Sequence, residues 1–236
     1  MRQSQNFAIL VAAGKGLRMG LETKKQYLSL DKIPILARTI MAFDMCDQVH
    51  EIVLVIPKHD HVYCKQNIID PFGFTKQIHL VEGGTQRQDS VLNGLKKVYD
   101  TTPLDKQTIV LIHDGVRPFV DQEMIKACIK KAIEYGACIP AVKITETIKQ
   151  ANSDLQVEKT INRQFLYTAQ TPQTFKLDLI LRAFDHAIKT CFSGTDDASL
   201  VEHLGDKVMI INGSKQNIKI TTKEDLVFGK QLLKSI

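Results

Sequence analysis

The segment FAILV at Phe7–Val11, followed by AAGKGLRMG at Ala12–Gly20, establishes the fold class of this chain. A short continuous apolar run that stops at glycine is typical of a strand buried on both faces. Such strands occur in parallel sheets that are covered by helices on both sides. The segment therefore predicts the first strand of an α/β protein and a glycine-rich turn after it.

Apolar runs and helical patterns alternate along the rest of the chain. Short apolar runs predict further strands at EIVLVIP around Val53, QIHLV around Leu80, TIVLIH at 108–113, ACIPAV near Cys138, 208–211 and 218–220. Helical spacing predicts helices that begin at Pro34, span about 91–98, 123–135, 179–188 and 198–204, and begin again at Lys223. Strands separated by single helices form right-handed βαβ units, so a Rossmann-like, doubly wound, mainly parallel sheet is expected. Functional residues should then follow the strands.

Length and composition predict one globular domain of 236 residues, because no Pro/Gly/Ser-rich linker interrupts the chain. No apolar run approaches the roughly 20 residues that cross a bilayer, and no signal peptide is expected. The five cysteines form no CxxC pair, so neither a disulfide framework nor a structural zinc site is predicted. A cytoplasmic location without membrane partners is therefore expected.

The first polar cluster is the turn after the first predicted strand. Gly14 and Gly16 let the backbone turn tightly and bring N–H groups toward an anion. Arg18 and Lys25 add positive charge to the same segment. An ordinary strand-to-helix turn explains one glycine but not two glycines with two cations nearby. A phosphate-binding loop is therefore predicted.

Other nucleotide and nucleic-acid binders match this chain less well. The dinucleotide fingerprint G-x-G-x-x-G would need a third glycine at Met19, and no acid for the ribose lies between Lys32 and Phe43. An NAD(P)-dependent oxidoreductase remains a disfavoured alternative. The mild net charge of +5 is compatible with a polyanionic substrate, a nucleic acid or no charged partner. A nucleic-acid binder would need clustered basic and aromatic residues, and with 6% aromatics and no tryptophan the chain gives a nucleic-acid partner little support.

The second cluster is EGGTQRQDSV, residues 82–91, after the third strand. Asp89 or Ser90 could start the next helix, and on this segment alone capping is the favoured interpretation. The functional alternative is that the glycine backbone and Ser90 meet the edge of a base.

The third cluster is HDGVRPF, residues 113–119. An aspartate at the end of a buried strand is costly unless it has a partner or a metal. Asp114 could hold a ribose hydroxyl or join a magnesium shell, and Arg117 could pair with it or meet a phosphate. A structural Asp–Arg pair is an equally good interpretation. His113 is interpreted as a hydrogen-bonded core histidine.

The fourth cluster is spread over the last third of the chain, at TETIK, TINR, QTPQTF, TDDAS and NIKIT. Thr195 with the two aspartates after it is typical of a helix start, with acids at the positive end of the dipole. Lys219 interrupts a short apolar strand, although an edge strand would also place it outward.

These motifs, in this order, resemble the 2-C-methyl-D-erythritol 4-phosphate cytidylyltransferase family nearly end to end. The resemblance implies transfer of CMP from CTP to a sugar-alcohol phosphate, with release of pyrophosphate, in isoprenoid precursor synthesis. Ribitol 5-phosphate cytidylyltransferase is the nearest alternative, but that relative tends to lack TDDAS and the AAG-type opening.

The resemblance also implies the roles of individual residues. The catalytic cations would be Arg18, Lys25, Arg163 and Lys219. The CTP site would comprise Ala12, Ala13, Gly14, Gly16, Gly84, Ser90 and Asp114, and the methylerythritol phosphate site Thr147, Arg163, Thr171, Thr195 and Lys219. Residues 143–166 would form an arm that reaches into the partner subunit of a homodimer, so that Thr147 and Arg163 serve the neighbour's site.

The implied chemistry needs no general base, because the attacking phosphate oxygen is already ionised at neutral pH. Positioning and electrostatics then supply nearly all of the catalysis. Mg²⁺ is the expected cofactor, held mainly by CTP phosphates and water rather than by a protein cage.

The resemblance is imperfect at a few positions. Lys24 and Lys143 stand where the family often has proline, and Thr85 and Glu146 where aspartate is common. HDGVRP replaces the commoner HDAARP. Lys24 is expected to loosen its loop or to add charge near the phosphates.

Overall fold

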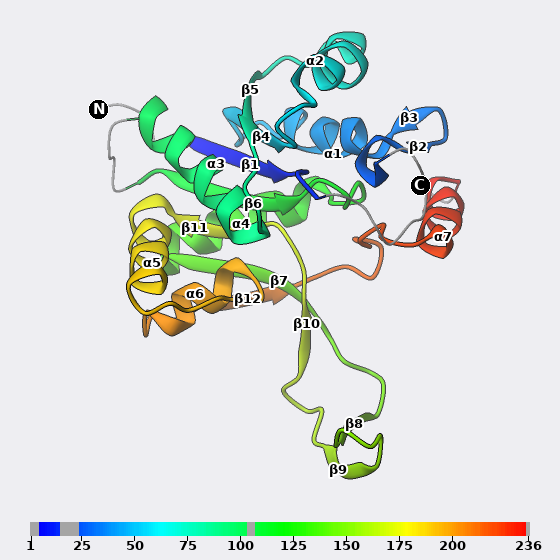
Figure 1. Cartoon of the computed structure of the whole chain (residues 1–236), viewed down its shortest axis with the longest axis vertical. Coiled ribbons are helices and arrows are strands. Elements are labelled where there is room, and N and C mark those ends of the chain that lie inside the picture. Colours follow the sequence, from blue (N-terminus) through cyan, green and yellow to red (C-terminus); the bar gives the residue numbers. More distant parts are fainter. Residues whose placement is uncertain (1–4, 15–23, 103–106, 235–236) are drawn as a thin grey trace.

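An eight-stranded sheet forms the centre of the molecule (Figure 1). The computed structural model describes residues 5–14, 24–102 and 107–234. Four parallel strands lie side by side in the order β5 (Gln77–Glu82), β4 (Glu51–Ile56), β1 (Asn6–Val11) and β6 (Ile109–Asp114). Their carboxyl ends therefore meet at one edge of the sheet. The Rossmann-like α/β fold expected from the sequence is confirmed.

The other half of the sheet mixes strand directions. Its strands are β7 (Ala137–Lys143), β10 (Tyr167–Ala169), β11 (Gln173–Lys176) and β12 (Met209–Asn212). β11 lies between β6 and β7 and runs antiparallel to both, while β12 pairs in parallel with the other edge of β7. No helix separates β7 from β10 and β11, so the returning chain runs antiparallel. The sequence-based prediction of strands separated by helices missed these two short strands.

Helices cover both faces of the sheet. α3 (Arg87–Thr101), α5 (Leu177–Lys189) and α6 (Asp197–His203) cover one face, and α1 (Ile35–Asp44) and α4 (Gln122–Tyr135) cover the other. Alternate residues of β1 serve the two cores, with Phe7 and Ile9 facing one and Ala8 and Leu10 facing the other. This alternation explains why the strand is apolar throughout.

Several smaller elements complete the fold. They are the short turn η2 (Lys25–Tyr27), strands β2 (Ser29–Leu30) and β3 (Ile33–Pro34), helix α2 (His61–Cys64), turns η3 (Lys65–Ile69) and η4 (Asp70–Phe72), and helix α7 (Lys223–Leu233). The strand predicted at 218–220 is wrong. That segment belongs to none of the described sheets, and its Ile220 N–H donates to the Val116 carbonyl at 2.9 Å.

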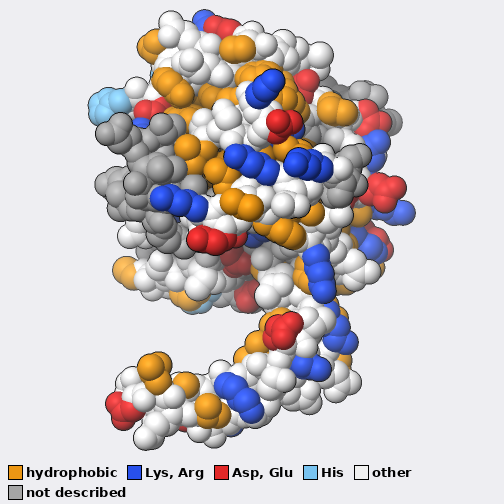
Figure 2. Space-filling view, turned by 90° about the vertical axis from the view of Figure 1, so that its right-hand side faces the viewer, with side chains coloured by type: hydrophobic (Ala, Val, Ile, Leu, Met, Phe, Trp, Pro, Cys, Tyr) orange, Lys and Arg blue, Asp and Glu red, His pale blue; other side chains and the backbone are white. Residues whose placement is uncertain are grey.

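A two-stranded arm leaves the body between β7 and β10. Its strands β8 (Ile148–Ala151) and β9 (Val157–Ile161) pair with each other and lie far from the main sheet in Figure 1. Figure 2 shows the arm as a curved projection from the body. Leu155 and Phe165 are 87% and 80% exposed, although both are large and apolar. None of the described helices is long and apolar enough to cross a membrane.

Candidate active site

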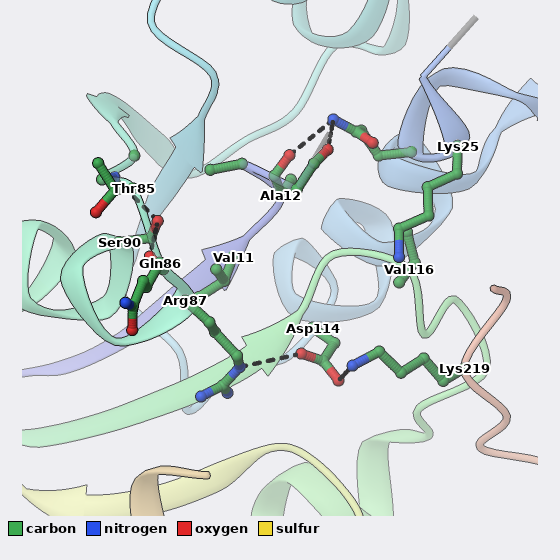
Figure 3. Close-up of a pocket in the computed structure, with 15 residues that line it drawn as sticks. Val11, Ala12, Lys25, Thr85, Gln86, Arg87, Ser90, Asp114, Val116 and Lys219 are labelled. Atoms are coloured by element: carbon green, nitrogen blue, oxygen red, sulfur yellow. Dashed lines mark hydrogen bonds and ion pairs between the residues drawn. The ribbon is translucent and has the colours of Figure 1, made fainter. Parts of the chain in front are cut away.

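A cavity of about 630 Å³ lies at the carboxyl ends of β1, β5 and β6. Figure 3 shows the side chains that surround it. Of the residues predicted for nucleotide binding and catalysis, the following line it: Ala12, Ala13, Gly14, Lys25, Gly84, Ser90, Asp114 and Lys219. Gly16 and Arg18 lie outside the described residues. Ala12 and Lys219, which are 207 positions apart in the sequence (219 − 12), therefore meet at the edge of the sheet where a ligand is expected to bind.

The loop after β5 needs its glycines for close packing. A Cβ atom on Gly83 would lie 2.2 Å from the Ala13 Cβ, and one on Gly84 would lie 2.2 Å from the Asp89 Cβ. The Ser90 hydroxyl accepts from the Gly84 N–H at 3.0 Å and donates to the Gln86 carbonyl at 2.9 Å. Ser90 therefore holds the glycine loop against α3.

Asp89, by contrast, has the capping role that the sequence suggested. Its carboxylate accepts from the Gln86 N–H at 3.0 Å, and Gln86 is the N-cap residue of α3. Of these two neighbouring residues, Asp89 has the capping role, and only Ser90 lines the cavity.

Asp114 lies at the centre of a charged cluster. Its Oδ2 atom is 2.9 Å from Lys219 Nζ and 3.3 Å from Arg117 Nε, and its Oδ1 atom is 3.6 Å from Arg87 Nε. Burial would raise the pKa of Asp114, but the charges of Lys219, Arg87 and Arg117 outweigh burial and hold that pKa well below its usual range. The carboxylate is therefore ionised at neutral pH. The Asp–Arg pair considered from the sequence is present, and it forms part of the cavity wall rather than a separate structural feature.

Arg87 is a site residue that sequence reasoning missed. Its two terminal nitrogens donate to the two carboxylate oxygens of Asp197 at 2.9 and 2.7 Å, and the Asp197 side chain is only 1% exposed. TDDAS does start a helix, because Asp196 accepts from the Ser199 N–H at 3.0 Å, but Asp197 is used for the ion pair. A signal was available: an arginine in the first turn of a helix opposes the helix dipole and needs a compensating anion.

A second cavity, of about 260 Å³, adjoins the first. The two share Arg87, Asp114 and Lys219 in their walls. The smaller one is also lined by Thr171 and Thr195, which were both predicted to bind the acceptor.

His113 supports the wall of this smaller cavity from beneath. It is fully buried, its Nδ1 atom is 3.0 Å from Thr171 Oγ1, and its Nε2 atom is 3.0 Å from the Arg117 carbonyl oxygen. Burial lowers the pKa of His113 to about 4, so the imidazole is neutral. It is the hydrogen-bonded core histidine that the sequence suggested.

Two predicted acceptor residues lie away from both cavities. Thr147 and Arg163 are exposed on the arm, and the Arg163 guanidinium donates to the Thr145 carbonyl. Neither residue lines either of the two cavities described above.

Comparison with known proteins shows the family of the chain. A family model described as 2-C-methyl-D-erythritol 4-phosphate cytidylyltransferase matches residues 7–235. Proteins of that name from Alkaliphilus oremlandii and Geobacillus kaustophilus are 46% and 44% identical to the chain. The first match covers 98% of this chain and 96% of the relative, and the second covers 97% and 96%. The chain belongs to this family.

Solved structures show the same likeness to cytidylyltransferases. The crystal structure of 4-diphosphocytidyl-2C-methyl-D-erythritol synthase from Anaerococcus prevotii superposes with a TM-score of 0.84 at 34% identity, covering 98% of this chain and 96% of that one. The 2-C-methyl-D-erythritol 4-phosphate cytidylyltransferase from Thermus thermophilus gives a TM-score of 0.78 at 27% identity, covering 98% and 100%.

The positions at which this cytidylyltransferase differs from the common family pattern have local structural roles. Lys24 directs its ammonium group to Asp60, at 2.6 Å, and lines neither cavity. Thr85 donates to Asp89 at 2.6 Å. A Cβ atom on Gly115 would lie 2.9 Å from the Ala12 Cβ, so glycine suits this close approach. Lys143 and Glu146 are exposed at the base of the arm.

Proposed function

We propose that this chain transfers CMP from CTP to 2-C-methyl-D-erythritol 4-phosphate, giving 4-diphosphocytidyl-2-C-methyl-D-erythritol and pyrophosphate for isoprenoid precursor synthesis. The observation that carries the proposal is the pair of adjoining cavities with Arg87, Asp114 and Lys219 in their shared wall. Two bound polyanions in these cavities would meet at a wall that carries two cations. Membership of the cytidylyltransferase family supports the same reaction.

The larger cavity suits the nucleotide. Backbone at Ala12, Ala13 and Gly14 and at the Gly83–Gly84 loop lines it, and Lys25 extends into it toward Val116 (Figure 3). Backbone N–H groups and a fixed ammonium group stabilise phosphate oxygens without reorganisation during the reaction. In this proposal Lys25 and Arg18 stabilise the charge that develops at the α-phosphorus, and Gly84 and Ser90 face the base.

The reaction itself requires little of the protein beyond placement. A phosphate oxygen of the acceptor attacks the α-phosphorus of CTP, the bond from that phosphorus to the bridging oxygen breaks, and pyrophosphate leaves. The acceptor phosphate is already ionised, so no residue has to remove a proton. Lys219 would hold this phosphate in line, because it lines both cavities.

Asp114 is the residue that fits a magnesium ion bound with the triphosphate. The described residues contain no group of three or more His, Cys, Asp or Glu side chains placed to hold a metal. Mg²⁺ binds nucleotides through phosphates, water and one or two carboxylates, and Asp114 supplies an ionised carboxylate in the cavity wall. When bound, the ion would neutralise triphosphate charge.

The acceptor site is proposed to be completed by a second copy of the chain in a homodimer. Within one chain the smaller cavity has Thr171, Thr195 and Lys219 for the acceptor, while Thr147 and Arg163 lie on the projecting arm. Exposed Leu155 and Phe165 on the arm are apolar surface that a partner subunit would cover. Arg163 would then add a second cation to the acceptor phosphate of the neighbouring subunit.

Pyrophosphate release tests the proposal directly. The purified chain with Mg²⁺ is supplied with CTP or UTP, each against methylerythritol phosphate and ribitol 5-phosphate. We expect the highest kcat/KM with CTP and methylerythritol phosphate. Faster turnover with ribitol 5-phosphate would identify ribitol 5-phosphate as the preferred acceptor. Absence of pyrophosphate in every combination would refute the proposal.

A further inference from the structure

The turn that carries Lys25 is held to the backbone after β1 by the next residue, Gln26. The Gln26 side chain is 1% exposed, and its Nε2 atom donates to the Ala12 carbonyl at 2.8 Å. Gln26 therefore ties the turn to the backbone that follows β1. This contact fixes the residue that directly follows Lys25, but it involves neither Lys24 nor Tyr27.

Asp60 provides a second anchor, from the side. Its carboxylate accepts from Lys24 Nζ at 2.6 and 2.7 Å and from the Tyr27 hydroxyl at 2.8 Å. Lys24 immediately precedes Lys25, and Tyr27 is two residues after it. One carboxylate thus holds the chain on both sides of the proposed catalytic lysine.

The geometry around Asp60 is specific for this role. Asp60 precedes α2 as its N-cap residue, yet its side chain makes no capping hydrogen bond and is directed to the turn instead. The carboxylate is mostly buried, at 12% exposure, and the Tyr27 ring lies 4.8 Å from that of Tyr63 in α2. The Lys24 side chain is 37% exposed, so the ion pair is partly buried, and its charge-assisted hydrogen bonds have a defined direction.

The state of Tyr27 is consistent with this geometry. Burial, followed by the hydrogen bond to Asp60, raises the pKa of Tyr27 above its usual range. The hydroxyl therefore stays protonated at physiological pH and acts as the donor.

We infer that Asp60 is a positioning residue for Lys25, acting through Lys24 and Tyr27. The inference rests on the proposed function, because it assigns Asp60 a part in placing the lysine that stabilises the charge at the α-phosphorus. Asp60 lines neither of the two cavities. Its contribution passes through the backbone of the turn, and it can therefore be separated from binding.

Asp60→Asn removes the charge with little change in size, and Tyr27→Phe removes one hydroxyl. Small misplacements of a catalytic group can cost up to about 10²-fold in rate, so we expect kcat for Asp60→Asn to fall between roughly tenfold and 10²-fold. The KM for the acceptor should stay within about twofold, because interactions made mainly in the transition state act on kcat. Tyr27→Phe should lower kcat in the same direction by a smaller factor.

The decisive measurement repeats Asp60→Asn in a Lys25→Ala background. If Asp60 acts through Lys25, kcat of the double variant equals that of Lys25→Ala alone. Asp47→Asn is the control for the loss of an aspartate–lysine ion pair as such, because Asp47 makes a 2.8 Å ion pair with Lys126, is 73% exposed and lines neither cavity. The melting temperature and the Kd for CTP are measured on every variant.

The outcomes separate the inference from the proposed function. An equal loss of kcat in both backgrounds would show that Asp60 acts independently of Lys25, and a lower melting temperature with unchanged kcat would leave Asp60 a purely structural residue. Either result overturns the inference while wild-type pyrophosphate release still stands. A wild-type chain without pyrophosphate release would instead remove the proposed function itself.

Discussion

The two cavities are built in different ways although they share a wall. The larger one is formed by loops that directly follow the parallel strands β1, β5 and β6. Besides Arg117 and the shared wall, which includes Lys219, the smaller one is formed by residues 169–173, which return from the arm, and by Thr195 and Asp196 before α6. The carboxyl ends of parallel strands meet at one edge of a sheet because of the topology. The smaller cavity instead depends on tertiary contacts between segments whose meeting the sheet topology does not predict. The larger cavity, proposed for the nucleotide, should therefore depend less on the rest of the chain than the smaller one.

The strongest test of the nucleotide side is Lys25→Ala. We expect turnover to fall by roughly 10²-fold or more, as the loss of a preorganised electrostatic stabiliser typically does. The kcat of pyrophosphate release at saturating CTP and acceptor measures this effect. Wild-type turnover in the variant would remove Lys25 from the mechanism.

The free energy of unfolding should depend on pH through His113, which contacts Thr171 in the wall of the smaller cavity. Its pKa is about 4 in the folded chain because of burial, against about 6.5 when unfolded. As pH falls from 6.5 to 4 the unfolded state binds the proton first, so this group lowers the free energy of unfolding by about 3 kcal/mol in total. Above pH 6.5 it contributes no pH dependence. Urea unfolding between pH 7 and pH 4, compared with His113→Asn, measures the difference. Identical pH profiles would contradict the assignment.

A pair of glycine substitutions tests how closely the nucleotide loops pack. Gly84→Ala places a Cβ atom 2.2 Å from the Asp89 Cβ, whereas one on Gly14 meets nothing within 4 Å. We expect Gly84→Ala to lower the free energy of unfolding by about 1–3 kcal/mol, as overpacking does, and Gly14→Ala to change it by less than about 0.5 kcal/mol. Chemical denaturation provides both values. Equal effects would mean that the loop after β5 relaxes freely.

The arm supplies the smallest expected effect. Arg163→Ala should raise the KM for the acceptor by roughly tenfold, which corresponds to the loss of one charged contact worth about 1.4 kcal/mol. The KM for CTP should change much less. A rise in the KM for CTP alone would place Arg163 on the nucleotide side instead.

Mixed dimers show whether that contact crosses between subunits. A dimer of one Lys25→Ala and one Arg163→Ala chain would contain one site with both wild-type residues and one site with neither. Partial recovery of activity over the two variant homodimers is therefore expected. Well-mixed dimers without recovery would argue against a site shared between subunits.

The difference between the cavities is also a difference in what could be predicted. The residues assigned to the nucleotide site through the resemblance line the larger cavity wherever they are described, because they lie at or just after the ends of β1, β5 and β6 or in the first turn of α3. Arg87 and Asp197 were missed, since their pairing joins segments 110 residues apart. The strand predicted at 218–220 was wrong for a related reason: its apolar residues pack beside α7 and Val116 instead of joining the sheet.

The sequence alone determined the α/β class, the order of the main helices and strands, the glycine loops and the family. Periodicity and turn residues are local properties, and the ordered motifs carry the resemblance. The antiparallel return of β11, the pairing of Arg87 with Asp114 and Asp197, and the contacts of Asp60 on both sides of Lys25 became visible only in three dimensions. Those contacts depend on the meeting of distant segments, and their energies come from buried charges whose partners no local pattern identifies.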